Sequence, residues 1–266
     1  MPGASLVADR LERYRERHPG IEVSLVGHSA GTILIGALAR RLAASMPIHS
    51  MSFMGAALRA DEFRSAVLPL VRRKRVQDFA NFVLSDKLEL DDQCDFNGVT
   101  FYHKSLLYLV ARGFERPDND DREVGLVGMA RFLAKPSGGG TVTLGDEIRL
   151  AGGAVIVSPS SGKLGSMSAA TGHASFDENK RTMGSVLFRI LGRQGSDYES
   201  NAPPAPAAIA NQPPPAPARP AVPDIAAFSI KADEAAPKTD FAPTSRSDVL
   251  QVLESEGFET VEVSPG

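Results

Sequence analysis

The first 193 residues of the chain alternate between two kinds of hydrophobic pattern. Short apolar runs bounded by Gly, Pro or polar residues are typical of buried β-strands. Longer segments place apolar residues three and four positions apart, which predicts amphipathic helices. The expected strands cover residues 21–26, 51–57, 78–84 and 154–158, and the expected helices cover residues 4–18, 30–44, 61–71, 103–114 and 180–191. Because strands and helices alternate, the pattern predicts an α/β fold with a mostly parallel sheet flanked by helices.

The connections between these elements carry weaker patterns. Residues 87–98 are expected to form a polar loop, and residues 126–133 a short helical patch. The segment Thr141–Leu150 alternates apolar and polar positions about Gly145-Asp146, which favours a β-hairpin. A loop rich in Ser and Gly is expected to join the fourth strand to the last helix.

The character of the chain changes after residue 193. Residues 202–223 consist largely of Pro and Ala, a composition that cannot bury a core and favours an extended, flexible chain. We therefore expect an α/β domain over residues 1–193 and a disordered, Pro/Ala-rich tail over residues 194–266, with a short helix near residues 248–256. The tail is interpreted either as weakly structured throughout or as a docking peptide on a flexible arm.

Composition narrows the function classes. Of the 266 residues, 42% are hydrophobic, enough for a core, and the net charge of −3 gives no support for binding to nucleic acid or to a membrane. The basic run Arg72–Arg75 follows an expected helix and is interpreted as a solvated surface. The single cysteine, Cys94, excludes an internal disulfide and fits a reducing compartment. With neither a signal peptide nor an apolar run of spanning length in view, the sequence predicts a cytoplasmic protein.

The strongest motif lies where the first expected strand meets the next helix, in the segment IEVSLVGHSAGTILI. Here Gly27-His28-Ser29-Ala30-Gly31 matches G-x-S-x-G in its strand–turn–helix context, which predicts a nucleophile elbow. The sharp turn would raise the Ser29 hydroxyl above the carboxyl edge of the sheet. The two glycines are expected because side chains there would collide with neighbouring elements. The amide of Ala30 can point at a developing oxyanion, and His28 is expected to line the entrance or pack beside the turn.

A nucleophilic serine needs a general base, and the base needs an acid that orients it. In α/β-hydrolases these residues follow in the order Ser, Asp or Glu, His. Asp86 stands just past the third expected strand, and His173 stands in the loop after the fourth. The order therefore predicts Ser29 as nucleophile, Asp86 as acid and His173 as base, the alternative for His173 being an ordinary surface-loop histidine.

Other residues compete for these roles. Asp91 and Asp92 lie in the same expected loop as Asp86 and are alternative acids. Together with Asp95 these carboxylates suggest a Ca²⁺ site, but their spacing fits no EF-hand loop, so we interpret them as solvated acids and expect no metal. His103 is expected to open a helix, where the positive end of the helix dipole disfavours an imidazolium, and is interpreted as structural.

Four segments, VGHSAG, FVLSDKLELDDQC, YHKSLLYLVARGFE and GHASFDENKRTMGSVLFRILG, are similar to bacterial α/β-hydrolase-like proteins of undefined substrate. Residues 1 to about 193 resemble the carboxyl-terminal half of this superfamily. The resemblance implies Ser29 as nucleophile, Asp86 as acid, His173 as base and the Ala30 amide as one oxyanion donor. It implies a small-molecule acyl substrate and no organic cofactor.

A complete α/β-hydrolase has several strands before its elbow strand, whereas about one helix precedes it here. The resemblance implies that the absent part supplies the second oxyanion donor. Without the absent strands, residues 21–26 would form an open apolar edge of the sheet. Two hypotheses follow. The chain is a serine hydrolase of esterase or lipase type that cleaves an ester or related acyl bond. Alternatively, it is an inactive fragment or interaction module that associates with itself or with a partner chain through the open edge.

Overall fold

The computed structural model describes residues 2–96, 99–115, 123–136 and 141–192. All of them belong to the first of two units into which the chain divides, Met1–Ser200. The expected tail, residues 194–266 with its short helix near 248–256, lies outside the described residues.

The fold is built on a four-stranded sheet whose strands all run parallel. Its strands stand in the spatial order β1-β2-β3-β6, the same as their order along the chain, so β1 is an edge strand of the described sheet. The expected α/β class with a mostly parallel sheet is confirmed. The strands are β1 (Ser24–His28), β2 (Ile48–Met54), β3 (Val76–Leu84) and β6 (Ala154–Ser158).

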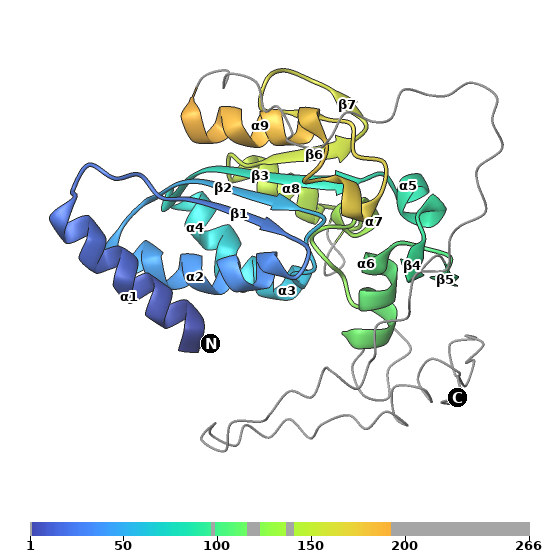
Figure 1. The fold of residues 1–266 in the computed structure, drawn as a ribbon, viewed down its shortest axis with the longest axis horizontal. Helices are drawn as coiled ribbons and strands as arrows, with labels where there is room; N and C mark the ends of the chain where they lie inside the picture. The colour runs from blue at the N-terminus through green and yellow to red at the C-terminus, as the bar shows by residue number, and fades with distance from the viewer. Residues whose placement is uncertain (1, 97–98, 116–122, 137–140, 193–266) are drawn as a thin grey trace, which may run out of the picture. The chain divides into compact units, whose positions relative to one another are not determined.

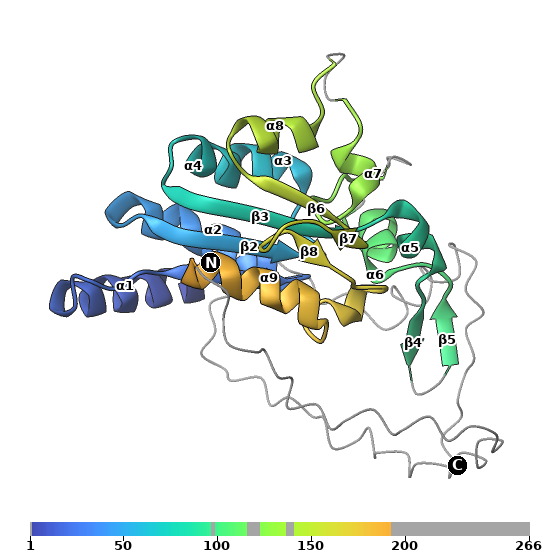
Figure 2. The same cartoon turned by 90° about the horizontal axis from the view of Figure 1, so that it is seen from above.

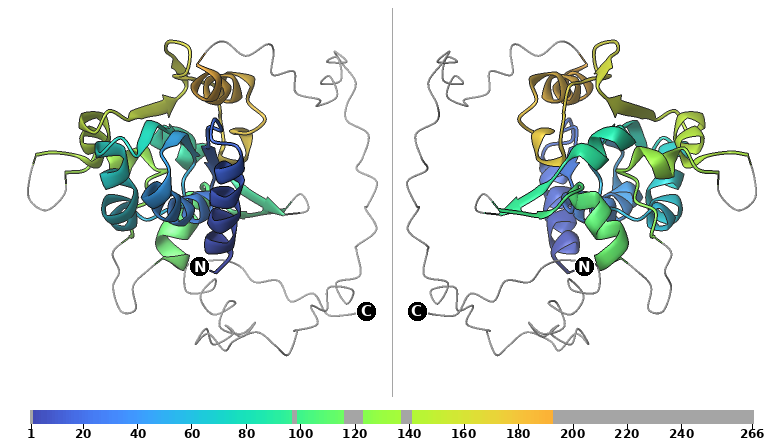
Figure 3. Two further views of the ribbon diagram at one scale, coloured as in Figure 1. Left: turned by 90° about the vertical axis from the view of Figure 1, so that its left-hand side faces the viewer. Right: turned by 90° about the vertical axis from the view of Figure 1, so that its right-hand side faces the viewer.

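Helices cover both faces of this sheet (Figures 1 and 3). One face carries α9 (Lys180–Leu191) alone, and α1 (Pro2–Arg17) packs against α2 on the other side. No helix within the described ranges is long and apolar enough to cross a membrane. The face of the sheet opposite α9 is covered by α2 (Gly31–Ser45), α3 (Ala60–Glu62), the π-helical turn η1 (Phe63–Val67), α4 (Leu68–Arg72) and α8 (Leu144–Leu150).

The core follows from the two-residue period of the strands. On β3, Phe79 and Val83 pack toward α2, η1 and α8, whereas Phe82 and Leu84 pack toward α9. Phe79 also meets the ring of Phe53 on β2 at a centroid distance of 5.3 Å. A strand buried on both faces is apolar at most positions, and from Phe79 to Leu84 only Asn81 is polar; its side-chain amide donates to the Val127 carbonyl at 2.8 Å.

Smaller elements lie beyond the carboxyl ends of the strands, where α5 directly follows β3 (Figure 2). They frame the end of the sheet at which Ser29 stands. These elements are α5 (Asp86–Asp91), the antiparallel pair β4 (Cys94–Phe96) and β5 (Val99–Tyr102), α6 (Leu106–Leu109), the π-helical turn η2 (Val110–Phe114), α7 (Ala130–Leu133), the short antiparallel pair β7 (Ser160–Ser161) and β8 (Met167–Ser168), and the 3₁₀ turn η3 (His173–Ser175).

The expected β-hairpin over Thr141–Leu150 is wrong, because this segment forms α8. The hydroxyl of Thr143 accepts a hydrogen bond from the Asp146 amide at 3.1 Å, and the Asp146 carboxylate accepts one from the Thr143 amide at 3.3 Å. This reciprocal pair is a capping box, which starts a helix at Leu144. The local cap therefore overrides the apparent alternation.

Three further expectations are corrected near the carboxyl edge. The expected polar loop over residues 87–98 contains most of α5 and all of β4. The following helix begins at Leu106, capped by Ser105, so His103 is an exposed residue before the helix and not its first residue. Of the helical patch expected over residues 126–133, only the last four residues are helical.

Candidate functional site

Ser29 stands in a tight turn between the end of β1 and the start of α2. Its φ of +53° lies in the left-handed region, which non-glycine residues seldom adopt and which is often found at functional sites. The turn is held by the main chain, since the Ser29 amide donates to the carbonyl of Met54 at 2.9 Å. The Ser29 carbonyl accepts from the Thr32 hydroxyl at 2.7 Å and from the Ala57 amide at 3.2 Å. The strained conformation is thus fixed by β2 and by the first turn of α2.

The two glycines that flank the turn have different roles. A Cβ atom at Gly27 would lie 2.7 Å from Cδ1 of Ile35 and 3.1 Å from the carbonyl carbon of Gly31, so a side chain there would press on the Ile35 side chain and on the backbone of α2. A Cβ atom at Gly31 would meet nothing within 4 Å. The expected steric need therefore applies to Gly27 and is wrong for Gly31.

The Ala30 amide lies at the start of α2. Ala30 is exposed, has helical φ and ψ of −59° and −25°, and its amide donates no hydrogen bond to another described residue. An unpaired amide at a helix N-terminus favours a nearby negative charge. The geometry therefore fits the expected role of the Ala30 amide as one oxyanion donor.

The structure brings His173 to Ser29, although the two residues are 144 positions apart in the chain. Nε2 of His173 lies 2.9 Å from Oγ of Ser29, a hydrogen-bond distance. His173 opens η3 and is buried, with 6% of its surface exposed, whereas Ser29 is half-buried. A base in contact with an accessible hydroxyl is the arrangement that activates a serine.

His173 makes two further hydrogen bonds, both through its main chain. Its amide donates to Oδ2 of Asp92 at 2.7 Å, and its carbonyl accepts from Nε2 of His28 at 2.9 Å. The two imidazole rings lie 5.0 Å apart. Nδ1 of His173 is buried and has no hydrogen-bond partner among the described residues. It faces Gly55, where a Cβ atom would lie 2.9 Å away.

Burial lowers the pKa of His173 from 6.5 to about 4. The neighbouring His28 acts in the same direction, and the negative charge of Asp177 acts in the opposite one. At pH 7 the imidazole is therefore neutral, which is the form that can accept a proton.

The three candidate acids occupy different environments. Asp86 accepts a hydrogen bond from the Tyr108 hydroxyl at 2.8 Å and makes none with His173. Asp91 is exposed at the end of α5. Asp92, the C-cap of α5, contacts His173 through the amide and not through the ring. Among the described residues, the structure thus joins Ser29 to His173, but no carboxylate is hydrogen-bonded to Nδ1 of the ring.

A buried acid in α5 was missed by sequence reasoning. The side chain of Glu89 is fully buried and accepts a hydrogen bond from the Ser105 hydroxyl, while the Ser105 amide donates to the Glu89 carbonyl at 2.8 Å. Burial raises the pKa of Glu89 from 4.5 to about 7, opposed by the Ser105 hydrogen bond and reinforced by the charges of Asp92 and Asp86. The neighbouring leucines do not indicate this burial, since Leu90 is 43% exposed.

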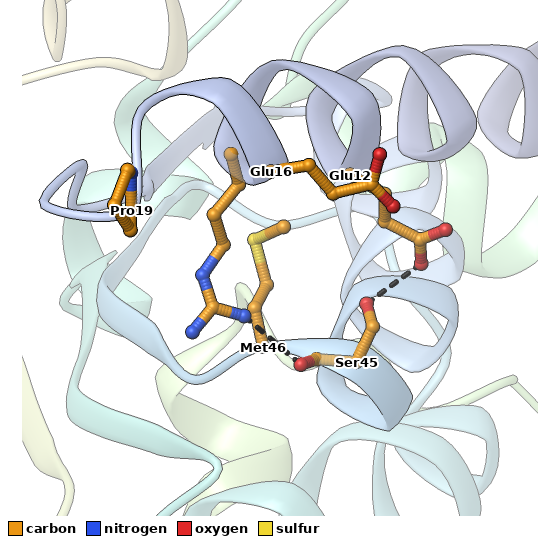
Figure 4. A pocket seen from close by; sticks show the side chains of 6 residues that line it. Glu12, Glu16, Pro19, Ser45 and Met46 are labelled. Carbon is orange, nitrogen blue, oxygen red and sulfur yellow. Dashed lines mark hydrogen bonds between the residues drawn. The ribbon is translucent and has the colours of Figure 1, made fainter.

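A surface pocket lies at the far end of α2 from Ser29 (Figure 4). At this end the Ser45 hydroxyl donates to Glu12 at 2.6 Å, and Arg15 donates to the Ser45 carbonyl at 3.0 Å. Since α2 has 15 residues, the pocket is roughly 20 Å from the turn and is separate from the candidate site. Its lining residues are Glu12, Arg15, Glu16, Pro19, Ser45 and Met46.

Within the described residues, no group of three or more His, Cys, Asp or Glu side chains is arranged to hold a metal ion. Comparison of the chain with family models, curated proteins and solved structures finds no match.

Proposed function

We propose that this chain is a serine hydrolase that cleaves an ester or related acyl bond of a small-molecule substrate, with Ser29 as nucleophile and His173 as base. One observation carries the proposal. The hydroxyl of Ser29, held in a left-handed turn between a strand and a helix, lies 2.9 Å from Nε2 of a buried, neutral histidine. A structural serine has no need for this combination of backbone strain, exposure and a neighbouring base.

In the proposed reaction, Ser29 Oγ attacks the carbonyl carbon of the substrate while His173 Nε2 takes its proton. The negative charge on the carbonyl oxygen is stabilised by the Ala30 amide and by the N-terminus of α2. As the tetrahedral intermediate collapses, His173 returns the proton to the departing alcohol and an acyl-serine remains. Water, deprotonated by His173, then hydrolyses the acyl-serine and regenerates Ser29.

The topology supports a truncated α/β-hydrolase-like fold. The elbow follows β1, the candidate acid Asp86 follows β3, and the base follows β6, in the order Ser, Asp, His that the resemblance implies. Asp86 has the position in the chain that this order predicts. Its carboxylate accepts a hydrogen bond from Tyr108 and not from His173, so Ser29 and His173 act without Asp86.

A second candidate function is an interaction module, favoured by the position of β1. This strand is at the edge of the described sheet, and Val26 in its middle is 39% exposed. An open edge strand is a template for pairing with another chain. A second copy of the chain or a partner strand would pair there. A shift to a dimer in sedimentation that is abolished by Val26→Pro, which removes a backbone donor, would support this function.

The hydrolase is tested by labelling the full chain with a fluorophosphonate, which reacts only with an activated serine. We expect the wild type to be labelled and Ser29→Ala to lose labelling completely. The matched control is Ser65→Ala, an exposed serine whose loss should leave labelling unchanged. Equal labelling of Ser29→Ala, or no labelling of a wild-type sample that unfolds cooperatively in urea, would contradict the proposal.

A further inference from the structure

The way in which His173 is held differs from the usual arrangement of a catalytic histidine. In a Ser-His-Asp triad, a carboxylate accepts the Nδ1 proton and so fixes the tautomer and the orientation of the ring. Here Nδ1 has no partner among the described residues, yet the amide, the carbonyl and Nε2 of the same residue are all hydrogen-bonded. Hydrogen bonds thus hold the amide, the carbonyl and Nε2 of His173. The ring atom without one is Nδ1, which is the atom that contacts the carboxylate in a triad.

The contact from Asp92 is the stronger of the two main-chain contacts, because an ionised carboxylate accepts it at 2.7 Å. The second oxygen of Asp92 accepts from the amide of Gln93 at 3.0 Å, and the Asp92 amide donates to Leu88 at 2.9 Å, so the side chain has a defined position. A Cβ atom at Gly172 would lie 2.9 Å from Oδ1 of Asp92. Glycine next to the histidine therefore permits the carboxylate to approach.

The contact from His28 reaches the other side of the peptide unit. A carbonyl oxygen can only accept, so Nε2 of His28 carries the proton that it donates to His173. His28 directly precedes Ser29 and also packs against the ring of Phe176 at 6.1 Å between centroids. The elbow itself therefore supplies one half of the support for the base.

The helix that carries Asp92 is anchored at two further points. At its start, Asp86 accepts a hydrogen bond from Tyr108, and in its middle Glu89 is bonded to Ser105 through both side chain and main chain. Both partners belong to α6 or its cap. The position of Asp92 relative to the sheet is therefore set by the packing of α5 on α6.

From these contacts we propose that Asp92 and His28 position His173 through its main-chain amide and carbonyl, and thereby hold the imidazole against Ser29 without a carboxylate on Nδ1. This inference rests on the proposed function and names two positioning residues for it. In this arrangement both oxygens of Asp92 accept backbone hydrogen bonds, one from His173 and one from Gln93.

The test compares Asp92→Asn, which keeps an acceptor, with Asp92→Ala, which removes it. Asp91→Ala, a neighbouring and exposed aspartate, is the matched control. Hydrogen–deuterium exchange of the His173 amide reports on positioning without any need for activity, and the fluorophosphonate labelling rate reports on Ser29. We expect Asp92→Ala to raise exchange about tenfold or more and, since small misplacements of catalytic groups cost up to about 10²-fold, to slow labelling by about 10- to 10²-fold. Asp92→Asn keeps one acceptor but loses the charge and the second acceptor, so it should fall between the wild type and Asp92→Ala in both measurements.

A second variant covers the case in which Asp92→Ala does not fold. His28→Phe keeps a ring against Phe176 but removes the donor to His173, and we expect it to slow labelling about tenfold.

Two results would overturn the inference. One is unchanged exchange at the His173 amide in Asp92→Ala, and the other is a labelling rate that Asp92→Ala lowers no more than Asp91→Ala does. The exchange of the His173 amide could change as expected while the wild-type chain is not labelled by the fluorophosphonate. That result would support the positioning contacts and contradict only the hydrolase function.

Discussion

Ser29 and His173 meet at one hydrogen bond, but different parts of the molecule hold them in place. The conformation of Ser29 is set by a strand, a turn and a helix that are contiguous in the chain, with Met54 at the end of β2 and Ala57 just after it as further hydrogen-bond partners. His173 lies in a loop, and its position depends on Asp92, which is 81 residues away, and on His28, which is 145 residues away. The nucleophile is therefore a local feature of the chain, and the base is a product of tertiary structure.

The two residues also differ in their access to water. Ser29 is half-buried and can meet a substrate, whereas His173 is buried and its pKa is lowered to about 4. Burial keeps the base neutral and fixed, but it also makes the base dependent on everything packed around it. Changes around α5 and η3 should thus alter reactivity and pH dependence together, and so should changes at His28, which contacts His173 from the turn.

The largest effect is expected from His173→Gln, which keeps the size of the side chain but removes the base. Because general-base catalysis contributes about 10² to 10⁴, we expect the fluorophosphonate labelling rate to fall about 10³-fold. The control is His103→Gln, since His103 is exposed before α6, and its labelling should be unchanged. A loss of less than fivefold in His173→Gln would show that Ser29 is activated without this histidine.

The pH dependence of the same variant gives a second measurement. In the unfolded chain a histidine titrates near 6.5, whereas the pKa of folded His173 is about 4, so the unfolded state takes up a proton first as the pH falls. This contribution to stability is present above pH 6.5 and is lost as the pH falls toward 4. It amounts to about 3 kcal/mol, and urea unfolding should show it in the wild type and not in His173→Gln.

The next effect is expected on stability, from Glu89→Gln in α5. The pKa of folded Glu89 is raised to about 7 from 4.5, so its contribution to stability is present below pH 4.5 and is lost as the pH rises through 7. From pH 5 to pH 8 the wild type should therefore lose about 3 kcal/mol relative to the variant. Urea unfolding at both pH values measures this difference. The control is Glu62→Gln, at an exposed glutamate, which should keep the wild-type pH dependence of stability. If Glu89→Gln also keeps the wild-type pH dependence, Glu89 is already ionised at pH 5 and the prediction is wrong.

The smallest effect is expected at the elbow glycines, which form a matched pair. Gly27→Ala places a Cβ against Ile35 and the Gly31 backbone and should destabilise the protein by about 1–3 kcal/mol. Gly31→Ala adds a methyl group in open space within a helix and should be neutral or stabilising by up to about 1 kcal/mol. Thermal unfolding of the two variants provides the comparison. Equal destabilisation by both would show that the turn, and not the local clash, requires glycine.

Local patterns predicted those parts of the molecule that depend on local interactions. The fourth strand at 154–158 and the last helix at 180–191 have the bounds that the hydrophobic period predicts. The turn at Ser29 was also predictable, because its motif combines strand, glycine and helix signals within a few residues. The capping box at Thr143 is also a local signal, and it determines the structure of this segment despite the alternation of polar and apolar residues that favours a hairpin.

The parts that escaped prediction depend on contacts between distant segments. Nothing in the sequence near Asp92 indicates that its carboxylate accepts from the amide of His173, and nothing near Asp86 indicates its bond with Tyr108. Glu89 was missed because a buried carboxylate looks like a solvated one until the packing of α5 on α6 is known. Chain order could place an acid after the third strand, but only the fold shows which groups each acid contacts.

The order of the sheet has a consequence for folding. Because β1, β2, β3 and β6 are neighbours in the order in which they occur in the chain, each strand can pair with the one before it without waiting for a later segment. The β1–β2 and β2–β3 pairings close much shorter loops than the β3–β6 pairing, whose connection spans residues 85–153, and shorter loops cost less entropy to close. The turn at Ser29 is complete once β2 has paired and Ala57 has reached the Ser29 carbonyl, whereas His173 can reach Ser29 only after β6 has joined the sheet. During synthesis, the nucleophile would be formed long before its base.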